Sequence, residues 1–172
     1  MKKVKEFAAT TSGSYPAIMT SCFVGAHCLL GTMDALLLLS NDELTTLMPS
    51  TPVYKVDCND EAVFVIRGIQ REFGYILTSH LHKALGSSAA SSIEGRFVPL
   101  VSRKCHAFAL GRFHGKHGVA VAADETVRVF IFAHDKSAEE IHSFRLDQIP
   151  SSLIFTSTSI ITGTEPMVLL YN

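Results

Sequence analysis

Residues 29–39 decide the expected fold, because they read Leu-Leu-Gly-Thr-Met-Asp-Ala-Leu-Leu-Leu-Leu. This is a short apolar strand, a Gly-Thr step, a turn and a second apolar strand. Residues 160–170 repeat the pattern, and looser copies begin at Val63 and Val119. Intervals of 37, 54 and 41 residues, with a mean of 44, separate the equivalent small residues Gly31, Gly68, Ala122 and Gly163. Periods of about 40–45 residues with four strands per unit are typical of propeller blades. We therefore expect an all-β, antiparallel, β-propeller-like chain of about four blades.

The composition fits a folded domain with no general affinity for nucleic acid. The chain has 172 residues, of which 47% are hydrophobic and 18% are charged. This hydrophobic fraction is sufficient for a core, whereas a disordered chain would be more polar. The net charge is −1, and the basic residues cluster only at Lys2-Lys3-Val4-Lys5. Phosphate binding needs an extended basic surface, so we expect no nucleic-acid partner.

The sequence indicates a cytoplasmic protein without a membrane span. The longest apolar runs, around residues 22–31 and 36–39, are far shorter than the ~20 residues that a transmembrane helix needs. No unbroken apolar segment follows Lys2 and Lys3, so we expect no secretory signal. Four cysteines without a framework spacing are expected to be reduced thiols packed as small apolar residues: Cys22, Cys28, Cys58 and Cys105.

The chain divides into a flexible start and one folded unit. Residues 1–16 are polar and rich in Ser, Thr and Gly, so we expect a flexible N-terminal segment. Residues 17–172 carry the repeated strands. Residues 86–95, which include Ser87-Ser88-Ala89-Ala90-Ser91-Ser92, bury too little apolar surface to offset their chain entropy. We expect a mobile connector there, which explains the interval of 54 residues.

Three segments resemble the citron homology (CNH) domain, most of all the C-terminal region of citron-type kinases. The first is residues 29–36, the second is Cys105-His106-Ala107-Phe108-Ala109-Leu110-Gly111, and the third is Ile160-Ile161-Thr162-Gly163-Thr164. The resemblance runs across most of residues 17–172. It implies that this region is a partial CNH domain, one part of a larger seven-bladed propeller.

The resemblance also implies a role as a protein-interaction or scaffold module. In citron-type kinases this role belongs to Rho-linked cytoskeletal regulation and cytokinesis. The implied partners are cytoskeletal motors or small GTPases, and the implied location is the cytoskeleton, cleavage furrow or midbody. The alternative is the CNH domain of a vacuolar or endosomal tethering subunit in vesicle traffic. The family has no catalytic residue in this domain, so none is carried over.

A metal- or Cys/His-dependent hydrolase is the remaining alternative. His114 and His117 form a His-x-x-His pair, but zinc needs three or four converging ligands. Cys105 and His106 are adjacent in an expected strand, so their side chains point to opposite faces. The kinase signatures His-Arg-Asp and Asp-Phe-Gly are absent from the sequence. We therefore expect no enzyme activity, no catalytic residue, no metal and no cofactor, although a longer parent protein can carry a Ser/Thr kinase domain.

Candidate partner contacts lie in the expected turn around residue 113. Phe113 stands between Arg112 and His114, and aromatic residues and arginine are enriched among residues that dominate protein interfaces. Burial of Phe113 at a junction between blades is an equally good interpretation. We therefore treat Phe113, Arg112 and His114 as possible contact residues.

Overall fold

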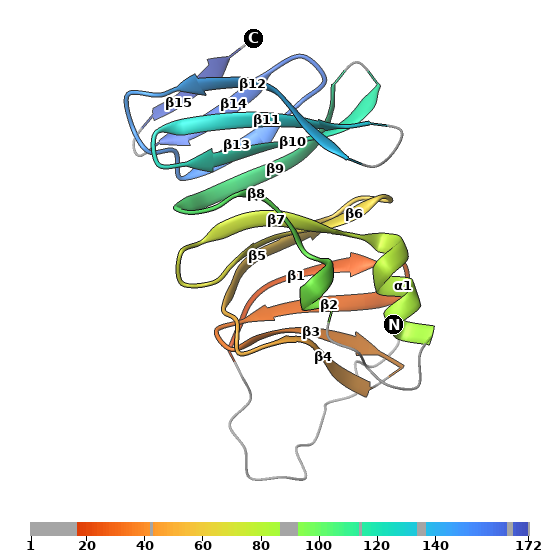
Figure 1. Cartoon of the computed structure of the whole chain (residues 1–172). Coiled ribbons are helices and arrows are strands. Elements are labelled where there is room, and N and C mark those ends of the chain that lie inside the picture. Colours follow the sequence, from red (N-terminus) through yellow and green to blue (C-terminus); the bar gives the residue numbers. More distant parts are fainter. Residues whose placement is uncertain are drawn as a thin grey trace, which may run out of the picture.

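Antiparallel sheets make up nearly all of the computed structural model (Figure 1). The structure describes residues 17–41, 43–86, 93–113, 115–133, 137–164 and 167–171. Within them lie four sheets, each formed by strands that are consecutive in the sequence. We call these sheets blades 1 to 4. The prediction of an all-β, propeller-like chain with about four blades is confirmed.

Each blade begins where the preceding one ends. Blade 1 contains β1 (Ile18–Val24), β2 (His27–Thr32), β3 (Ala35–Ser40) and β4 (Glu43–Pro49). Blade 2 contains β5 (Val53–Cys58), β6 (Ala62–Arg67), β7 (Glu72–Leu77) and β8 (Val98–Val101). Blade 3 contains β9 (Cys105–Phe113), β10 (Lys116–Ala123), β11 (Thr126–Phe132) and β12 (Ala138–Arg145). Blade 4 contains β13 (Ser152–Phe155), β14 (Ile160–Thr164) and β15 (Met167–Tyr171).

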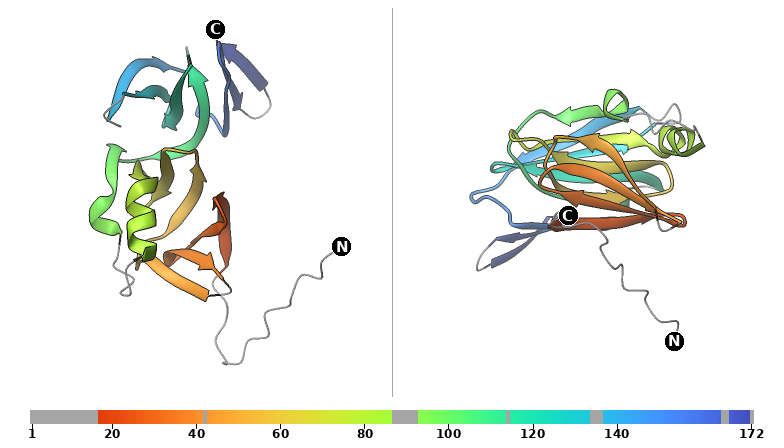
Figure 2. Two further views of the ribbon diagram at one scale, coloured as in Figure 1. Left: turned by 90° about the vertical axis from the view of Figure 1, so that its right-hand side faces the viewer. Right: turned by 90° about the horizontal axis from the view of Figure 1, so that it is seen from below.

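The blades follow one another along an arc (Figure 2, left). The first strand of each blade is the innermost, because β1 lies beside β5 and β9 lies beside β13. One direct link is the 3.2 Å hydrogen bond from the backbone N–H of Val56 in β5 to Oγ1 of Thr20 in β1. Blade 1 and blade 4 form the two ends of this arc, and they are separated in the same view.

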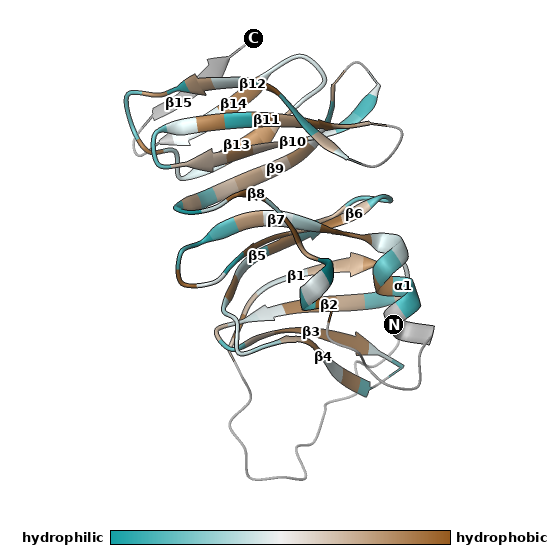
Figure 3. Ribbon diagram, viewed as in Figure 1, coloured by the Kyte–Doolittle hydropathy of each residue, from teal (hydrophilic) through white to brown (hydrophobic). Residues whose placement is uncertain are grey.

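Apolar side chains fill the space between adjacent blades. Leu29 and Leu36 of blade 1 pack with Val65 of blade 2 in the first cluster. The second cluster is aromatic and joins blades 2 and 3 through Phe64 and Phe108. Hydrophobic stretches accordingly follow the strands, as Figure 3 shows. The core is therefore a series of sheet-to-sheet contacts, as expected for stacked blades.

The junction between blades 3 and 4 depends on two glycines. Gly111 of β9 pairs with Gly118 of β10, and both lie against Phe155 of β13. A Cβ at Gly111 would come within 2.7 Å of the carbonyl oxygen of Phe155. The absence of side chains at these two positions lets the Phe155 ring approach the sheet closely. Together with Ala107, Phe155 belongs to the third apolar cluster.

Two outer strands and one helix differ from the sequence prediction. The sequence pattern assigns neither β4 nor β8 to a strand, yet both complete their sheets as outermost strands. One helix, α1 (Thr78–Gly86), follows β7 in blade 2. In the expected connector, Gly86 ends α1 and Glu94–Arg96 form a 3₁₀ helix, next to the buried Ile93. Residues 87–92 and the expected flexible segment 1–16 lie outside the described residues.

Candidate interaction site

A continuous series of backbone hydrogen bonds joins the loops on one side of the arc, where strands of all four blades begin or end. The N–H of Thr51 donates to the carbonyl of Asp34 at 2.9 Å, which links the connection between blades 1 and 2 to the β2–β3 turn. Four further hydrogen bonds each connect one loop to the next. Named from the backbone N–H donor to the carbonyl acceptor, they run from Gly68 to Pro52, Lys104 to Gln70, Asp124 to Lys104, and Leu146 to Glu125. We call this set of loops the loop belt, and it comprises residues 33–34, 50–52, 68–71, 102–104, 124–125 and 146–151.

Unusual backbone geometry is concentrated in the loop belt. Five described residues other than glycine have a positive φ, and four of them belong to the belt. These are Ser50, Arg71, Lys104 and Asp124, with φ between 49° and 60°. Non-glycine residues in this region cost on the order of 1 kcal/mol each and are enriched at functional sites. The hydrogen bonds between loops hold these conformations, so the belt is preorganised.

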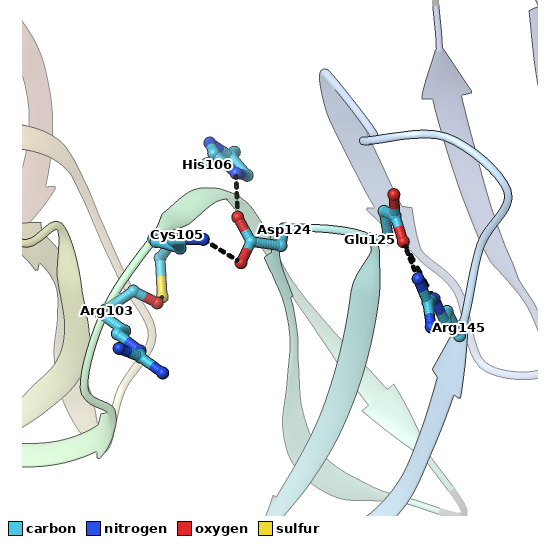
Figure 4. Close-up of polar contacts among 7 residues, drawn as sticks. Arg103, Cys105, His106, Asp124, Glu125 and Arg145 are labelled. Atoms are coloured by element: carbon cyan, nitrogen blue, oxygen red, sulfur yellow. Dashed lines mark hydrogen bonds and ion pairs between the residues drawn. The ribbon is translucent and has the colours of Figure 1, made fainter.

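Charged side chains lie across the blade 3 part of the belt. Nζ of Lys104 lies 2.9 Å from Oδ2 of Asp124, and Nε2 of His106 lies 3.9 Å from Oδ1 of the same carboxylate. Arg145 at the end of β12 donates through Nε to Oε2 of Glu125 at 2.9 Å. Figure 4 shows Asp124 facing His106 and Glu125 facing Arg145. Such exposed ion pairs contribute little to stability, typically about 0–1 kcal/mol, but they present oriented charges to solvent.

A polar cavity of about 520 Å³ lies beside the belt, between β8 and the β10–β11 turn. Two guanidinium groups, those of Arg103 and Arg128, line it together with the carboxylate of Asp124. Arg128 also faces Glu140 at 3.8 Å, whereas Arg103 makes no ion pair with any described residue. Arg103 is thus a cation available for a carboxylate of a partner.

Exposed apolar residues accompany these charges in three loops of the belt. Ile69 in the β6–β7 turn is 88% exposed, Met33 is 49% exposed and Ile149 is 53% exposed. A surface that combines exposed aliphatic residues with arginine resembles protein-binding surfaces, in which apolar anchors are surrounded by polar groups.

The contact residues expected from the sequence lie on the opposite side of the arc, at the other ends of the blade 3 strands. Arg112 is exposed at the end of β9, and its Nη2 lies 3.5 Å from Nε2 of His117. Phe113 is half-buried and packs against the cluster between blades 3 and 4, where it lines a cavity of about 300 Å³. His114 lies outside the described residues. The structure therefore brings Arg112 and Phe113 together only as neighbours in one strand.

The Cys105 thiol is poorly suited to nucleophilic chemistry. Its side chain is fully buried, and burial raises the pKa of the thiol to about 12. The neighbouring His106 is directed to the other side of β9, towards Asp124. A thiol with this pKa has almost no thiolate at neutral pH, and the thiolate is the reactive form.

Histidines in the described part of the chain do not form a metal centre. No group of three or more His, Cys, Asp or Glu side chains converges in the described ranges. His117 is next to Arg112, and His82 is exposed on α1. All four cysteines are free, and Cys22 and Cys105 are buried.

Sequence reasoning missed the loop belt because its signal is weak. Ile69 and Gln70 follow Gly68 in a turn, and an isolated isoleucine in a turn gives no periodic pattern. Arg103 and Lys104 form a short basic pair that is indistinguishable from an ordinary solvated loop. The presence of a large aliphatic residue where turns usually carry polar residues was the one available signal.

Comparisons with known proteins give the fold. No family model matches the sequence, and no curated protein matches it either. Among solved structures, the AfRom2 CNH domain is similar with a TM-score of 0.68 and 13% identity, over 89% of this chain and 51% of that chain. The β-propeller domain of Myceliophteria thermophila Cps50 (Swd1) gives a TM-score of 0.61 and 9% identity, over 91% of this chain and 53% of that one.

The WD40 domain of Neurospora crassa Pan2 is also similar, with a TM-score of 0.56 and 13% identity, over 87% of this chain and 44% of that one. The chain therefore spans about half the length of these domains. At such low identity the likeness concerns the fold alone. It confirms the CNH-like β-propeller fold, and it does not extend to citron-type kinases in particular. No helix in the described ranges is long and apolar enough to cross a membrane.

Proposed function

We propose that this chain is a non-catalytic protein-interaction module, and that it binds its partner through the loop belt. The observation that carries the proposal is the belt itself. Backbone hydrogen bonds connect its loops, and Ile69 and Arg103 are an exposed aliphatic side chain and an exposed cation that forms no ion pair with the residues the structure describes. A rigid surface of this kind loses little conformational entropy when it binds, which favours affinity.

We further propose a partner from Rho-linked cytoskeletal regulation, either a small GTPase or a cytoskeletal motor. This finer proposal is supported by the resemblance of residues 105–111 and 160–164 to citron-type domains, together with the CNH-like fold. The chemistry of the belt favours a partner surface with an apolar patch for Ile69 and a carboxylate near Arg103. In such a pathway the chain would act as a scaffold in the cytoplasm, at the cleavage furrow or midbody.

Calorimetric titration of purified Rho-type GTPases and of midbody motor domains tests this function. We expect a dissociation constant in the micromolar range for at least one of them. Ile69→Asp and Arg103→Glu should each raise it by about tenfold or more, as for central interface residues. Both side chains are exposed, so neither change should affect folding.

Arg112→Glu is the matched comparison, because Arg112 is an exposed arginine on the opposite side of the arc from the loop belt. It should leave the affinity unchanged. If Arg112→Glu weakens binding and the two belt variants do not, the contact surface is the one around Arg112, Phe113 and His114. If none of the proteins binds the folded chain, the Rho-linked assignment is wrong.

A further inference from the structure

The outward face of blade 1 carries an apolar row that crosses all four strands. Phe23 pairs with Cys28, Cys28 with Leu39, and Leu39 with Leu44 in successive strands. Alternation along the strands directs this row away from blade 2, because Val24, Leu29 and Leu38 point into the cluster between the blades. Phe23 is 71% exposed and Leu44 is 55% exposed.

Blade 4 has an apolar row on its outward face as well. Ile154 of β13 pairs with Ile161 of β14. The adjacent residues Leu153 and Phe155 point towards blade 3, so the row of Ile154 points away from it. Ile154 is 57% exposed. Both ends of the arc therefore present apolar sheet faces like those that are buried between its inner blades.

We propose that a second copy of this chain covers both faces, so that two four-bladed arcs close into one ring. Blade 4 of each copy would pack on blade 1 of the other, which gives two equivalent contacts related by a twofold axis. The chain spans 51% of the AfRom2 CNH domain and 53% of the Swd1 β-propeller domain, so two copies provide about the length of one such domain. A head-to-tail contact gives a closed ring when the rotation between copies completes the circle.

The area covered in such a dimer is close to the lower bound for a specific interface. Strands lie about 4.8 Å apart and rise about 3.3 Å per residue, so a sheet of three strands and five residues covers about 240 Å² in projection. Blade 4 has three strands, of which β14 has five residues. Two contacts cover four such faces in the ring, or about 950 Å² as flat projected area. This area approaches the ~1,000 Å² expected of specific interfaces.

Light scattering coupled to size exclusion measures the assembly, with the 172-residue chain at about 1–100 µM. We expect a mass of twice the 18.7 kDa of one chain. Phe23→Lys and Ile154→Glu should each raise the dimer dissociation constant by about tenfold or more, because each places an unpaired charge in an apolar contact. Ile69→Glu is the control, since Ile69 is exposed in the loop belt and should leave the mass unchanged.

Mixing the two variants separates this arrangement from other dimers. In a ring that contains one copy of each variant, the positions of Phe23→Lys and Ile154→Glu face each other in one of the two contacts. The other contact is unaltered, so the mixture should regain the dimer.

A folded monomer at all concentrations overturns the proposal. So does a dimer that Phe23→Lys disrupts and Ile154→Glu does not, since that result indicates pairing of two blade 1 faces. Growth into larger open assemblies would also contradict a two-copy ring. None of these outcomes depends on binding through the loop belt.

Discussion

The side-chain amine of Lys55 donates a 2.6 Å hydrogen bond to the backbone carbonyl of Phe108 and lies 4.7 Å from the centre of the Phe108 ring. Lys55 belongs to β5 and Phe108 to β9, so this contact joins the innermost strands of blades 2 and 3. Burial lowers the pKa of the Lys55 ammonium below its usual 10.5, and the nearby Asp57 partly opposes that change. A cation thus links two blades at a cost in desolvation.

The Lys55 titration predicts a specific pH dependence of stability. Because the folded-state pKa lies below the unfolded value of 10.5, the unfolded chain binds more protons between these two values. The contribution of Lys55 to the free energy of unfolding should therefore rise as the pH increases through this window. Lys55→Met keeps the aliphatic volume and removes the titration. Urea unfolding from pH 7 to 10.5 should show a smaller rise with pH for Lys55→Met than for the wild type, and equal pH dependence would contradict this account.

Cys105 should resist alkylation in the folded protein. Burial raises the pKa of its thiol to about 12, whereas the unfolded value is 9.0. With iodoacetamide at pH 8, mass spectrometry of peptides should find Cys105 unmodified in the native chain and modified after unfolding. The half-buried Cys28 is an internal reference that should react faster. The Cys105 contribution to stability should be complete below pH 9 and lost as the pH rises towards about 12, which is the opposite of the Lys55 trend. Rapid native labelling of Cys105 would show that blades 2 and 3 separate easily.

The middle strands of each sheet are predictable from the sequence, whereas the outermost strands and the loop belt are not. β3 and β6 are continuous apolar runs, because the middle strands of stacked sheets are buried on both faces. β4 and β8 contain Pro49 and Pro99, and an outermost strand tolerates proline because one edge needs no hydrogen-bond donor. Their composition therefore resembled that of loops.

The contact residues show a similar limit. The sequence directed attention to Phe113 because it is an aromatic residue in a turn, yet Phe113 is half-buried between blades. The belt depends on hydrogen bonds between residues far apart in the sequence, such as Gln70 and Lys104. Tertiary contacts of this kind leave no periodic pattern along the chain, so only the three-dimensional arrangement reveals them.

Gly111→Ala should destabilise the junction between blades 3 and 4. The new methyl group would lie 2.7 Å from the Phe155 carbonyl oxygen and 2.9 Å from its Cγ, so either the ring or the strand must move. Overpacking of this kind typically costs about 1–3 kcal/mol in the free energy of unfolding. Gly95→Ala is the matched control, because a Cβ there meets nothing within 4 Å. Chemical denaturation of both variants should show a loss for Gly111→Ala alone, and equal stability would mean that the Phe155 contact is not close in solution.

The aromatic cluster between blades 2 and 3 should contribute strongly to the stability of the folded chain. Phe64 is fully buried, and its ring centre lies 6.2 Å from that of Phe73 and 5.4 Å from that of Phe132, which belongs to blade 3. Phe64→Ala removes these contacts and leaves a cavity, so we expect a loss of about 3–5 kcal/mol in the free energy of unfolding.

Ile69→Ala is the control for this substitution, because Ile69 is a large apolar residue that is 88% exposed. Its truncation should change the free energy of unfolding by less than about 0.5 kcal/mol. Denaturant titration followed by circular dichroism measures both values. Since blades 2 and 3 meet through this cluster, a small effect of Phe64→Ala would mean that the cluster does not hold the two blades together. Their stacking would then depend on other contacts, such as the one between Lys55 and Phe108.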